Sequence, residues 1–329
     1  MRILGFSRDA LTSCAAVAML AGCGGSQPPI GAPGAMAQTS ASATHADRVK
    51  SWMLPGSSSG DLIYATGGCG GTCVISYPDM KLVGDLPDSG VAICSDAQGN
   101  IFLPKDGKVV EYAHGGTAPV ATLNLPGGGG GGCTVDPISH NLAVVFESSS
   151  ASLAIFANEQ GTPTQYETHI LSNYCGYDGS GNLFVNGFDN QAFALSELLI
   201  GSSGFTKLSI SQSVGEPGQI QWDGNYMTWE TVDKPTIVSR LSIVGSTAKI
   251  VGTTTFNTKH KAFQSWISGN IIILPYNIRG TRPNVVGVWK YPKGGKVVST
   301  IRKFGEYAKR TISFQGVTLS LAPSHARTR

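Results

Sequence analysis

Short apolar runs separated by turns rich in Gly, Asn, Asp and Ser fill the chain from about residue 48 onward. Five segments repeat one pattern, in which an apolar run, a polar turn and a second apolar run follow one another. These segments are VAICSDAQGNIFL from Val91, CTVDPISHNLAVV from Cys133, YCGYDGSGNLFV from Tyr174, IQWDGNYMTW from Ile220 and FQSWISGNIIIL from Phe263. Short apolar runs bounded by such turns are typical of β-strands. The pattern therefore predicts an all-β fold.

The repeats are evenly spaced. Their turn residues are Asp61, Asn100, Asn141, Asn182, Asn225 and Asn270, at intervals of 39, 41, 41, 43 and 45 residues. A period just above 40 residues is the length of a four-stranded propeller blade. The runs LFVNGF, AFALSEL and FTKLSIS after Tyr177 supply the three further strands that such a blade needs. The period predicts a six-bladed β-propeller with four-stranded blades, over residues 48–324.

A propeller must close its ring, because open first and last blades would leave exposed strand edges. The segment GVTLSL from Gly316 aligns with the first strand of the other repeats, and no further strand follows it. We expect this terminal strand to complete the first blade, beside strands at residues 61–66, 73–78 and 81–86. Residues 48–54 compete for the same place, so the sequence leaves open which terminus closes the ring.

Two segments, GVAICSDAQGNIFL and CGYDGSGNLFV, resemble the NHL and YVTN propeller repeats, whose blades carry a motif like G-[IL]-A-V-D-x-x-G-N-[IL]-Y-V-A. The fifth and sixth repeats, counted from the one at Asp61, depart from that motif, since WDGNYMTW has a shorter turn and SWISGN lacks the Asp. The phrases SWM, VEYAHGGT and GVTLSLAP are similar to those of bacterial propeller lipoproteins. These resemblances imply an architecture and no activity.

The N-terminus is different in composition. Arg2 and Arg8 precede an apolar stretch at residues 10–21, as in a secretory signal. The following residues, LAGC, resemble the bacterial lipobox, which implies lipidation at Cys23; an ordinary signal peptide with a chance cysteine is the alternative. Residues 24–46 are too poor in bulky apolar residues to fold. We therefore expect a signal peptide at 1–22, a lipidated tether at 23–47, a tail at 325–329, and an exported, membrane-anchored protein of the cell envelope, periplasmic or surface-facing.

Five cysteines would remain after Cys23 in the mature protein. Cys69 and Cys73 flank Gly-Gly-Thr across a hairpin mouth, and in an exported protein this spacing favours a disulfide. Three more lie on the first strands of consecutive repeats, where we expect small buried core residues with their pairing left open. They are Cys94, Cys133 and Cys175. The histidines show no ligand spacing around the cysteines, so we expect no metal site.

Other motifs favour structure over chemistry. Aspartates end the first strand of successive repeats, where a carboxylate accepts hydrogen bonds from turn backbone. They are Asp96, Asp136, Asp178 and Asp223. The glycine run at 127–132 is followed by a strand without Lys-Ser or Lys-Thr, so it does not match a phosphate-binding loop. No G-x-S-x-G elbow is present, and we expect no catalytic residue and no cofactor.

Charge is divided unevenly along the chain. Residues 23–233 hold 6 basic and 19 acidic residues, a net charge of −13, whereas residues 234–329 hold 16 basic residues and 1 acidic residue, a net charge of +15. The repeat places nine cations in loops on one face of the last two blades. They are Lys234, Lys259, Lys261, Arg279, Arg282, Arg302, Lys303, Lys309 and Arg310. Such a face is either solvated or a docking site for an anionic glycan, a lipid headgroup or an acidic protein.

Two functions from different classes remain. The tether, the repeat and the lack of a catalytic motif favour a surface-anchored, non-catalytic binding or scaffolding propeller. The alternative is a metal-dependent lactonase like the gluconolactonase (SMP-30) propellers, which require carboxylate and amide ligands at the channel mouth; the sequence supplies no ligand set that can be named. We expect a monomer that contacts the membrane through its lipid and does not bind nucleic acid.

Overall fold

The computed structural model describes residues 51–146, 152–232, 235–258, 263–277, 283–305, 307 and 312–323. The chain divides into units 1–46 and 47–329, and all described residues belong to the second unit. The predicted signal peptide, Cys23, the tether and the tail therefore lie outside the described residues. Within the described part, no helix is long and apolar enough to cross a membrane.

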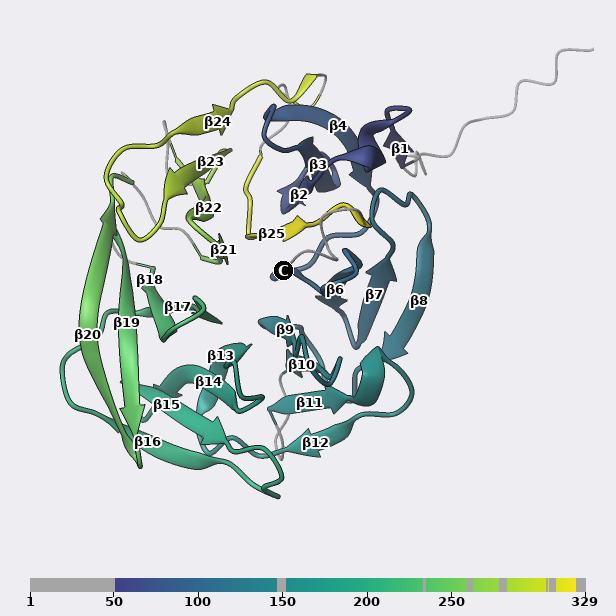
Figure 1. Ribbon diagram of the computed structural model, residues 1–329. Helices are drawn as coiled ribbons and strands as arrows, with labels where there is room; N and C mark the ends of the chain where they lie inside the picture. Colours follow the sequence, from purple (N-terminus) through teal and green to yellow (C-terminus); the bar gives the residue numbers. More distant parts are fainter. Residues whose placement is uncertain are drawn as a thin grey trace, which may run out of the picture. The chain divides into compact units, whose positions relative to one another are not determined.

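The described strands form six blades around a centre (Figure 1). From inside outward, blade 1 contains β25 (Gly316–Ser320), β2 (Leu62–Gly68), β3 (Gly71–Ser76), β4 (Lys81–Leu86) and β1 (Trp52–Met53). Blade 2 contains β5 (Cys94–Ser95), β6 (Ile101–Lys105), β7 (Lys108–Tyr112) and β8 (Pro119–Asn124). Blade 3 contains β9 (Cys133–Val135), β10 (Leu142–Val145), β11 (Leu153–Phe156) and β12 (Thr164–Tyr166).

The next three blades repeat this order. Blade 4 contains β13 (Leu171–Tyr177), β14 (Leu183–Asp189), β15 (Ala192–Leu198) and β16 (Thr206–Ile210). Blade 5 contains β17 (Pro217–Trp222), β18 (Met227–Thr231), β19 (Thr236–Val244) and β20 (Thr247–Phe256). Blade 6 contains β21 (Trp266–Ser268), β22 (Ile271–Tyr276), β23 (Val285–Lys290) and β24 (Ser299–Ile301). Parallel pairing of β16 with β20 joins blades 4 and 5 at their outer edges.

Both chain ends meet in blade 1. β25 pairs with β2 as the innermost strand, which confirms that the C-terminal strand completes the first blade. The sequence left open which terminus takes this place; residues 52–53 do not, because β1 pairs with β4 at the opposite, outer edge of the same sheet. Each innermost strand contacts those of its two neighbours, from β25 through β5, β9, β13, β17 and β21 and back to β25. The ring is therefore closed.

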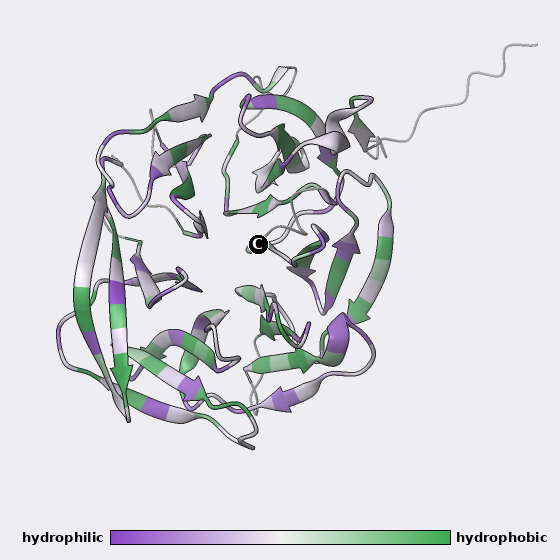
Figure 2. Cartoon of the chain, in the orientation of Figure 1, coloured by the Kyte–Doolittle hydropathy of each residue, from purple (hydrophilic) through white to green (hydrophobic). Residues whose placement is uncertain are grey.

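Six apolar clusters lie between neighbouring blades, one at each junction. Because alternate residues of a strand point to opposite faces, β2 serves two junctions: Ile63 and Ala65 face blade 6, and Leu62 and Tyr64 face blade 2. The inner strands must therefore be apolar on both faces. The long outer strands β19 and β20 instead alternate between hydrophilic and hydrophobic positions (Figure 2).

The strand-ending aspartates bind their own turns, as predicted. Asp96 Oδ1 accepts a hydrogen bond from Asn100 N and Oδ2 accepts one from Asn100 Nδ2, each at 2.7 Å. Asp178 repeats this arrangement with Asn182 at 2.9 Å for both bonds. The other two aspartates, Asp136 and Asp223, also accept backbone hydrogen bonds from their turns. The recurring Asp and Asn of the repeat are thus explained by turn structure.

Two disulfides are present in the described residues. One joins Cys69 to Cys73, and the other joins Cys94 of β5 to Cys133 of β9. The sequence left the pairing of Cys94 and Cys133 open; in the structure the two neighbouring innermost strands bring their Cα atoms to 5.7 Å and the residues are bonded. Cys175 is buried and free. The second disulfide links blade 2 covalently to blade 3.

Candidate functional site

Of the nine cations predicted to form a binding face, the structure describes two, Arg302 and Lys303. Both are exposed and follow directly after β24, the outer strand of blade 6. The other predicted cations lie outside the described residues: Lys234, Lys259, Lys261, Arg279, Arg282, Lys309 and Arg310. The candidate site is therefore built around the end of β24.

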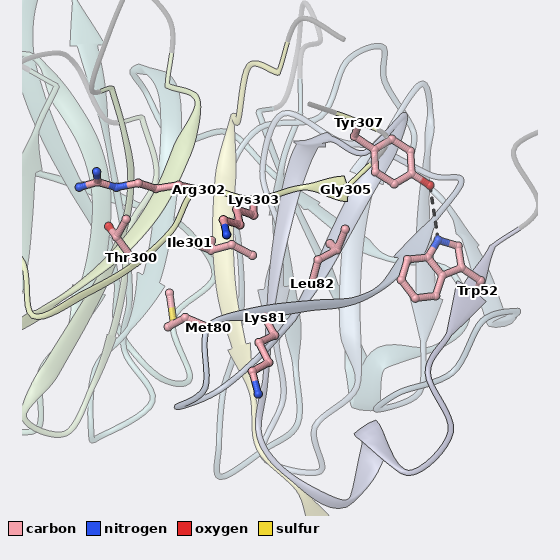
Figure 3. A pocket seen from close by; sticks show the side chains of 10 residues that line it. All are labelled: Trp52, Met80, Lys81, Leu82, Thr300, Ile301, Arg302, Lys303, Gly305 and Tyr307. Atoms are coloured by element: carbon pink, nitrogen blue, oxygen red, sulfur yellow. Dashed lines mark hydrogen bonds between the residues drawn. The ribbon is translucent and has the colours of Figure 1, made fainter. Parts of the chain in front are cut away.

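A cavity of about 550 Å³ lies beside these two residues, where the outer strands of blades 6 and 1 meet (Figure 3). Its lining residues are Trp52, Met80, Lys81, Leu82, Thr300, Ile301, Arg302, Lys303, Gly305 and Tyr307. Ring closure creates this cavity, because it places the end of β24 next to the start of β4. The volume falls within the range of about 300–1,000 Å³ that is usual for small-ligand sites.

Apolar and aromatic side chains form part of the wall. Ile301 is 2% exposed and belongs to the core cluster between blades 6 and 1, and Leu82 and Met80 pack against that cluster. Trp52 of β1 is half-buried, so its indole covers one side of the cavity (Figure 3). The cavity therefore offers a ligand apolar contact in addition to charge.

A hydrogen-bonded triad holds the aromatic side in place. Tyr307 Oη donates to Asp85 Oδ2 at 2.9 Å, and Trp52 N donates to Asp85 Oδ1 at 3.3 Å. Trp52 Nε1 in turn donates to Tyr307 Oη at 3.4 Å. Asp85 is fully buried. Because a buried carboxylate is costly without such partners, the triad fixes β1 against β4 and orients the indole.

Three cations surround the cavity, one from blade 1 and two from the segment after blade 6. They are Lys81, Arg302 and Lys303, and all three are exposed. No ion pair within the described residues involves any of them. Their summed charge attracts anions, and the attraction is strongest at low salt because the Debye length is then long. The lining contains no side chain paired as nucleophile and base, so the geometry supports binding.

The lactonase alternative requires a cluster of metal ligands. Within the described ranges, no group of three or more His, Cys, Asp and Glu side chains is arranged to hold a metal ion. The aspartates nearest the channel accept hydrogen bonds from their own turns instead. Nothing in the described residues therefore supplies the ligand set that this alternative needs.

Sequence reasoning missed Lys81, Trp52 and Tyr307. Lys81 lies more than two hundred residues before Arg302, and the two approach each other only because the ring closes. The sequence predicted that the ring closes, which makes blades 6 and 1 neighbours. Placing their outer strands side by side on that basis could have brought Lys81 and Arg302 together.

No family model and no curated protein matches the chain. Solved structures do match it in fold. A chain of a nidogen/laminin complex superposes with a TM-score of 0.59 at 11% identity, over 80% of this chain and 98% of that chain. A protein of unknown function from Bacteroides caccae gives 0.57 at 13% identity, over 80% and 99%. A protein assigned as TolB from Agrobacterium tumefaciens gives 0.51 at 14% identity, over 73% and 89%.

These similarities show one thing. The chain is a β-propeller. At such low identity they carry the fold alone, and the likeness to NHL and YVTN repeats stays at the level of the architecture.

Proposed function

We propose that this propeller is a non-catalytic binding module of the cell envelope that docks an acidic segment of a partner protein in the cavity between blades 6 and 1. The observation that carries the proposal is the combination of three cations without ion pairs in the described residues and an aromatic and aliphatic wall, around one cavity of about 550 Å³. Acidic side chains would meet the cations, and an adjacent apolar side chain would meet the indole of Trp52.

The wall residues suit a protein partner. Trp, Tyr and Arg are the residue types that most often dominate the energy of protein interfaces, and all three line this cavity as Trp52, Tyr307 and Arg302. The tether expected at residues 23–47 supports the same function, since it would hold the ring away from the lipid and leave its rim accessible. A polybasic surface alone would offer charge without this shaped apolar wall.

Charge reversal tests the proposal. Replacing Arg302 and Lys303 by Glu should weaken binding of a fluorescent acidic peptide with one central Leu by at least about tenfold, and wild-type binding should weaken as salt is raised. The matched control replaces Lys290 and Lys293 of the same blade by Glu, which changes net charge equally at exposed positions outside the cavity.

The control separates local from general electrostatics. Equal loss in both double variants would reduce the effect to net charge and contradict a specific site. Binding of heparin or of anionic vesicles with no binding of the peptide would contradict a protein partner. Trp52→Ala should weaken binding of the peptide because contact area is lost. The dependence of the peptide affinity on salt concentration should stay unchanged.

A further inference from the structure

A second cavity, of about 670 Å³, opens where the innermost strands end around the centre of the ring. Blades 2 to 6 and the chain's last strand contribute to it through the ends of those strands and the turns that follow, among them Asp96, Pro137, Asp178, Asp223, Ser268 and Leu321. It shares no lining residue with the cavity between blades 6 and 1. Any ligand here contacts several blades at once.

The carboxylates that line this cavity are already hydrogen-bonded to other groups of the protein. Both carboxylate oxygens of Asp96 and of Asp178 accept hydrogen bonds from their turns. Asp223 Oδ2 accepts hydrogen bonds from Arg240 Nε at 2.6 Å and from Tyr291 Oη at 2.7 Å. Among the described residues, no lysine or arginine lines this cavity. A charged ligand would find no unpaired opposite charge, so the cavity suits an uncharged one.

Two half-buried tryptophans from neighbouring blades face this cavity. Trp222 ends β17, and Trp266 begins β21. The indole of Trp222 lies against the backbone of blade 4, because a Cβ at Gly179 would come within 3.1 Å of its Nε1. Trp266 packs against two core clusters, the one between blades 6 and 1 and the one between blades 2 and 3. Both rings are therefore held at fixed positions.

Each of these indoles also has an N–H without a hydrogen-bond acceptor in the described part of the chain, although neither nitrogen is buried. The other tryptophan of blade 5 differs, since Trp229 Nε1 donates to Gly215 O at 3.2 Å inside the core. Trp222 and Trp266 thus both line the cavity, and each has an indole N–H without an acceptor among the described residues. A ligand must offer both apolar faces and acceptor oxygens to use them.

The wall also contains a side-chain amide whose oxygen accepts no hydrogen bond. Gln219 is 3% exposed; its Nε2 donates to Ile220 O at 2.9 Å, whereas Oε1 has no hydrogen-bond partner. Gln221, two residues on, is used at both atoms by Ile267 of blade 6. A buried carbonyl without a donor is unfavourable. A small turn of the Gln219 amide toward the cavity would let a ligand hydroxyl satisfy it.

We propose that this central cavity binds a neutral carbohydrate. A sugar ring has apolar C–H faces that stack on indoles, ether and hydroxyl oxygens that accept from indole N–H groups, and hydroxyl donors for the Gln219 carbonyl. Rigid aromatic side chains with one polar edge are suited to such amphipathic ligands. The cavity volume lies within the usual range for ligand sites of about 300–1,000 Å³.

The test uses the purified full chain on an array of neutral oligosaccharides built from glucose, galactose, mannose or N-acetylglucosamine, with sulfated and sialylated glycans on the same array. At least one neutral class should be retained, equally at low and high salt. Titration calorimetry with the retained sugar should then show a loss of about tenfold or more for Trp222→Ala. Trp266→Phe, which keeps a ring and loses the N–H, should weaken binding less.

Trp52→Ala is the matched control, because it removes an indole from the other cavity and should leave sugar affinity unchanged. Circular dichroism of each variant confirms the fold before binding is compared. Retention of charged glycans alone, retention of no glycan, or equal affinity in Trp222→Ala and wild type would each overturn the assignment. If Trp222→Ala loses sugar binding but still binds the acidic peptide, the central site is distinct from the cavity between blades 6 and 1.

Discussion

Replacing Glu230 by Gln should make the propeller more stable above pH 7 and reduce the dependence of its stability on pH. Glu230 of β18 is 1% exposed. Its Oε2 accepts hydrogen bonds from Ser265 N at 3.0 Å and Ser265 Oγ at 2.6 Å, while Oε1 has no partner. Burial raises the pKa of Glu230 to about 7, although the hydrogen bonds from Ser265 act in the opposite direction. The folded ring is therefore more stable when the Glu230 carboxyl group is protonated.

The sign follows from the two pKa values. An unfolded glutamate has a pKa near 4.5, so between about pH 4.5 and pH 7 the folded chain keeps a proton that the unfolded chain has released. Stability is therefore highest below about pH 4.5 for this group, and it falls as pH rises to about 7. At about 1.4 kcal/mol per pKa unit, the loss is about 1 kcal/mol at pH 5.5 and about 3 kcal/mol at pH 8. Between those two values of pH, Glu230 should cost about 2 kcal/mol.

Scanning calorimetry at pH 5.5 and pH 8 measures this difference as a change in Tm of several degrees, since about 1 kcal/mol shifts a domain of this size by roughly 2–4 °C. Glu159 adds to the wild-type slope, because burial and the carboxylates of Asp96 and Glu111 raise its pKa to about 7. Glu230→Gln should therefore flatten part of the slope, and adding Glu159→Gln should flatten most of the rest.

His114 works in the opposite direction, because burial lowers its pKa, but it does so equally in every variant. The difference between wild type and Glu230→Gln isolates the carboxylate. A Tm that falls as much in Glu230→Gln as in wild type between pH 5.5 and pH 8 would refute the reasoning.

Two further predictions concern the cysteines. Peptide mapping without reduction should find Cys94 linked to Cys133, and replacing both by Ala should lower stability by about 4 kcal/mol, because the bond closes a loop of 39 residues in the unfolded chain; free thiols at both positions in the exported protein would contradict the pairing. Replacing Cys23 by Ala should release the protein from the membrane fraction, and a variant that stays membrane-bound without acylation would contradict lipidation at that residue.

The sequence was sufficient to predict the blades because one constraint acts on all of them. Each inner strand must be apolar on both faces, and each turn needs the same polar residues, so the period appears directly in the residue pattern. The role of the N-terminal strand was not predictable in the same way. Trp52 and Met53 form a two-residue strand at the outer edge of β4, and so short an element has no periodicity of its own.

The candidate site was predictable only in part. Arg302 and Lys303 were identified from charge, whereas Trp52 and Tyr307 were not, because their role depends on the buried carboxylate of Asp85. Asp85 lies in β4 next to a run of apolar residues, and its sequence context resembles that of any acidic residue near a turn. Two of its donors, Trp52 N and Tyr307 Oη, come from opposite ends of the chain. Only the closed ring brings them together.

The cysteines show most clearly what spacing determines and what it leaves undetermined. Cys94, Cys133 and Cys175 are each about one period apart, so they lie on three consecutive innermost strands. Neighbouring positions in such a series are close enough to bond, yet three thiols form only one disulfide. Spacing alone does not choose between Cys94–Cys133 and Cys133–Cys175.

In the structure the first pair is bonded, and Cys175 Sγ instead donates to Gly132 O at 3.5 Å and Ala143 O at 3.7 Å, both on the neighbouring blade. Burial raises the pKa of the Cys175 thiol far above its usual range, so the thiolate that attacks disulfides is scarce. Because burial favours the protonated thiol and its Sγ contacts these carbonyls, we expect little exchange of Cys175 with the Cys94–Cys133 disulfide. The cysteines of three consecutive repeats thus join blades 2 and 3 covalently and blades 3 and 4 by weaker hydrogen bonds.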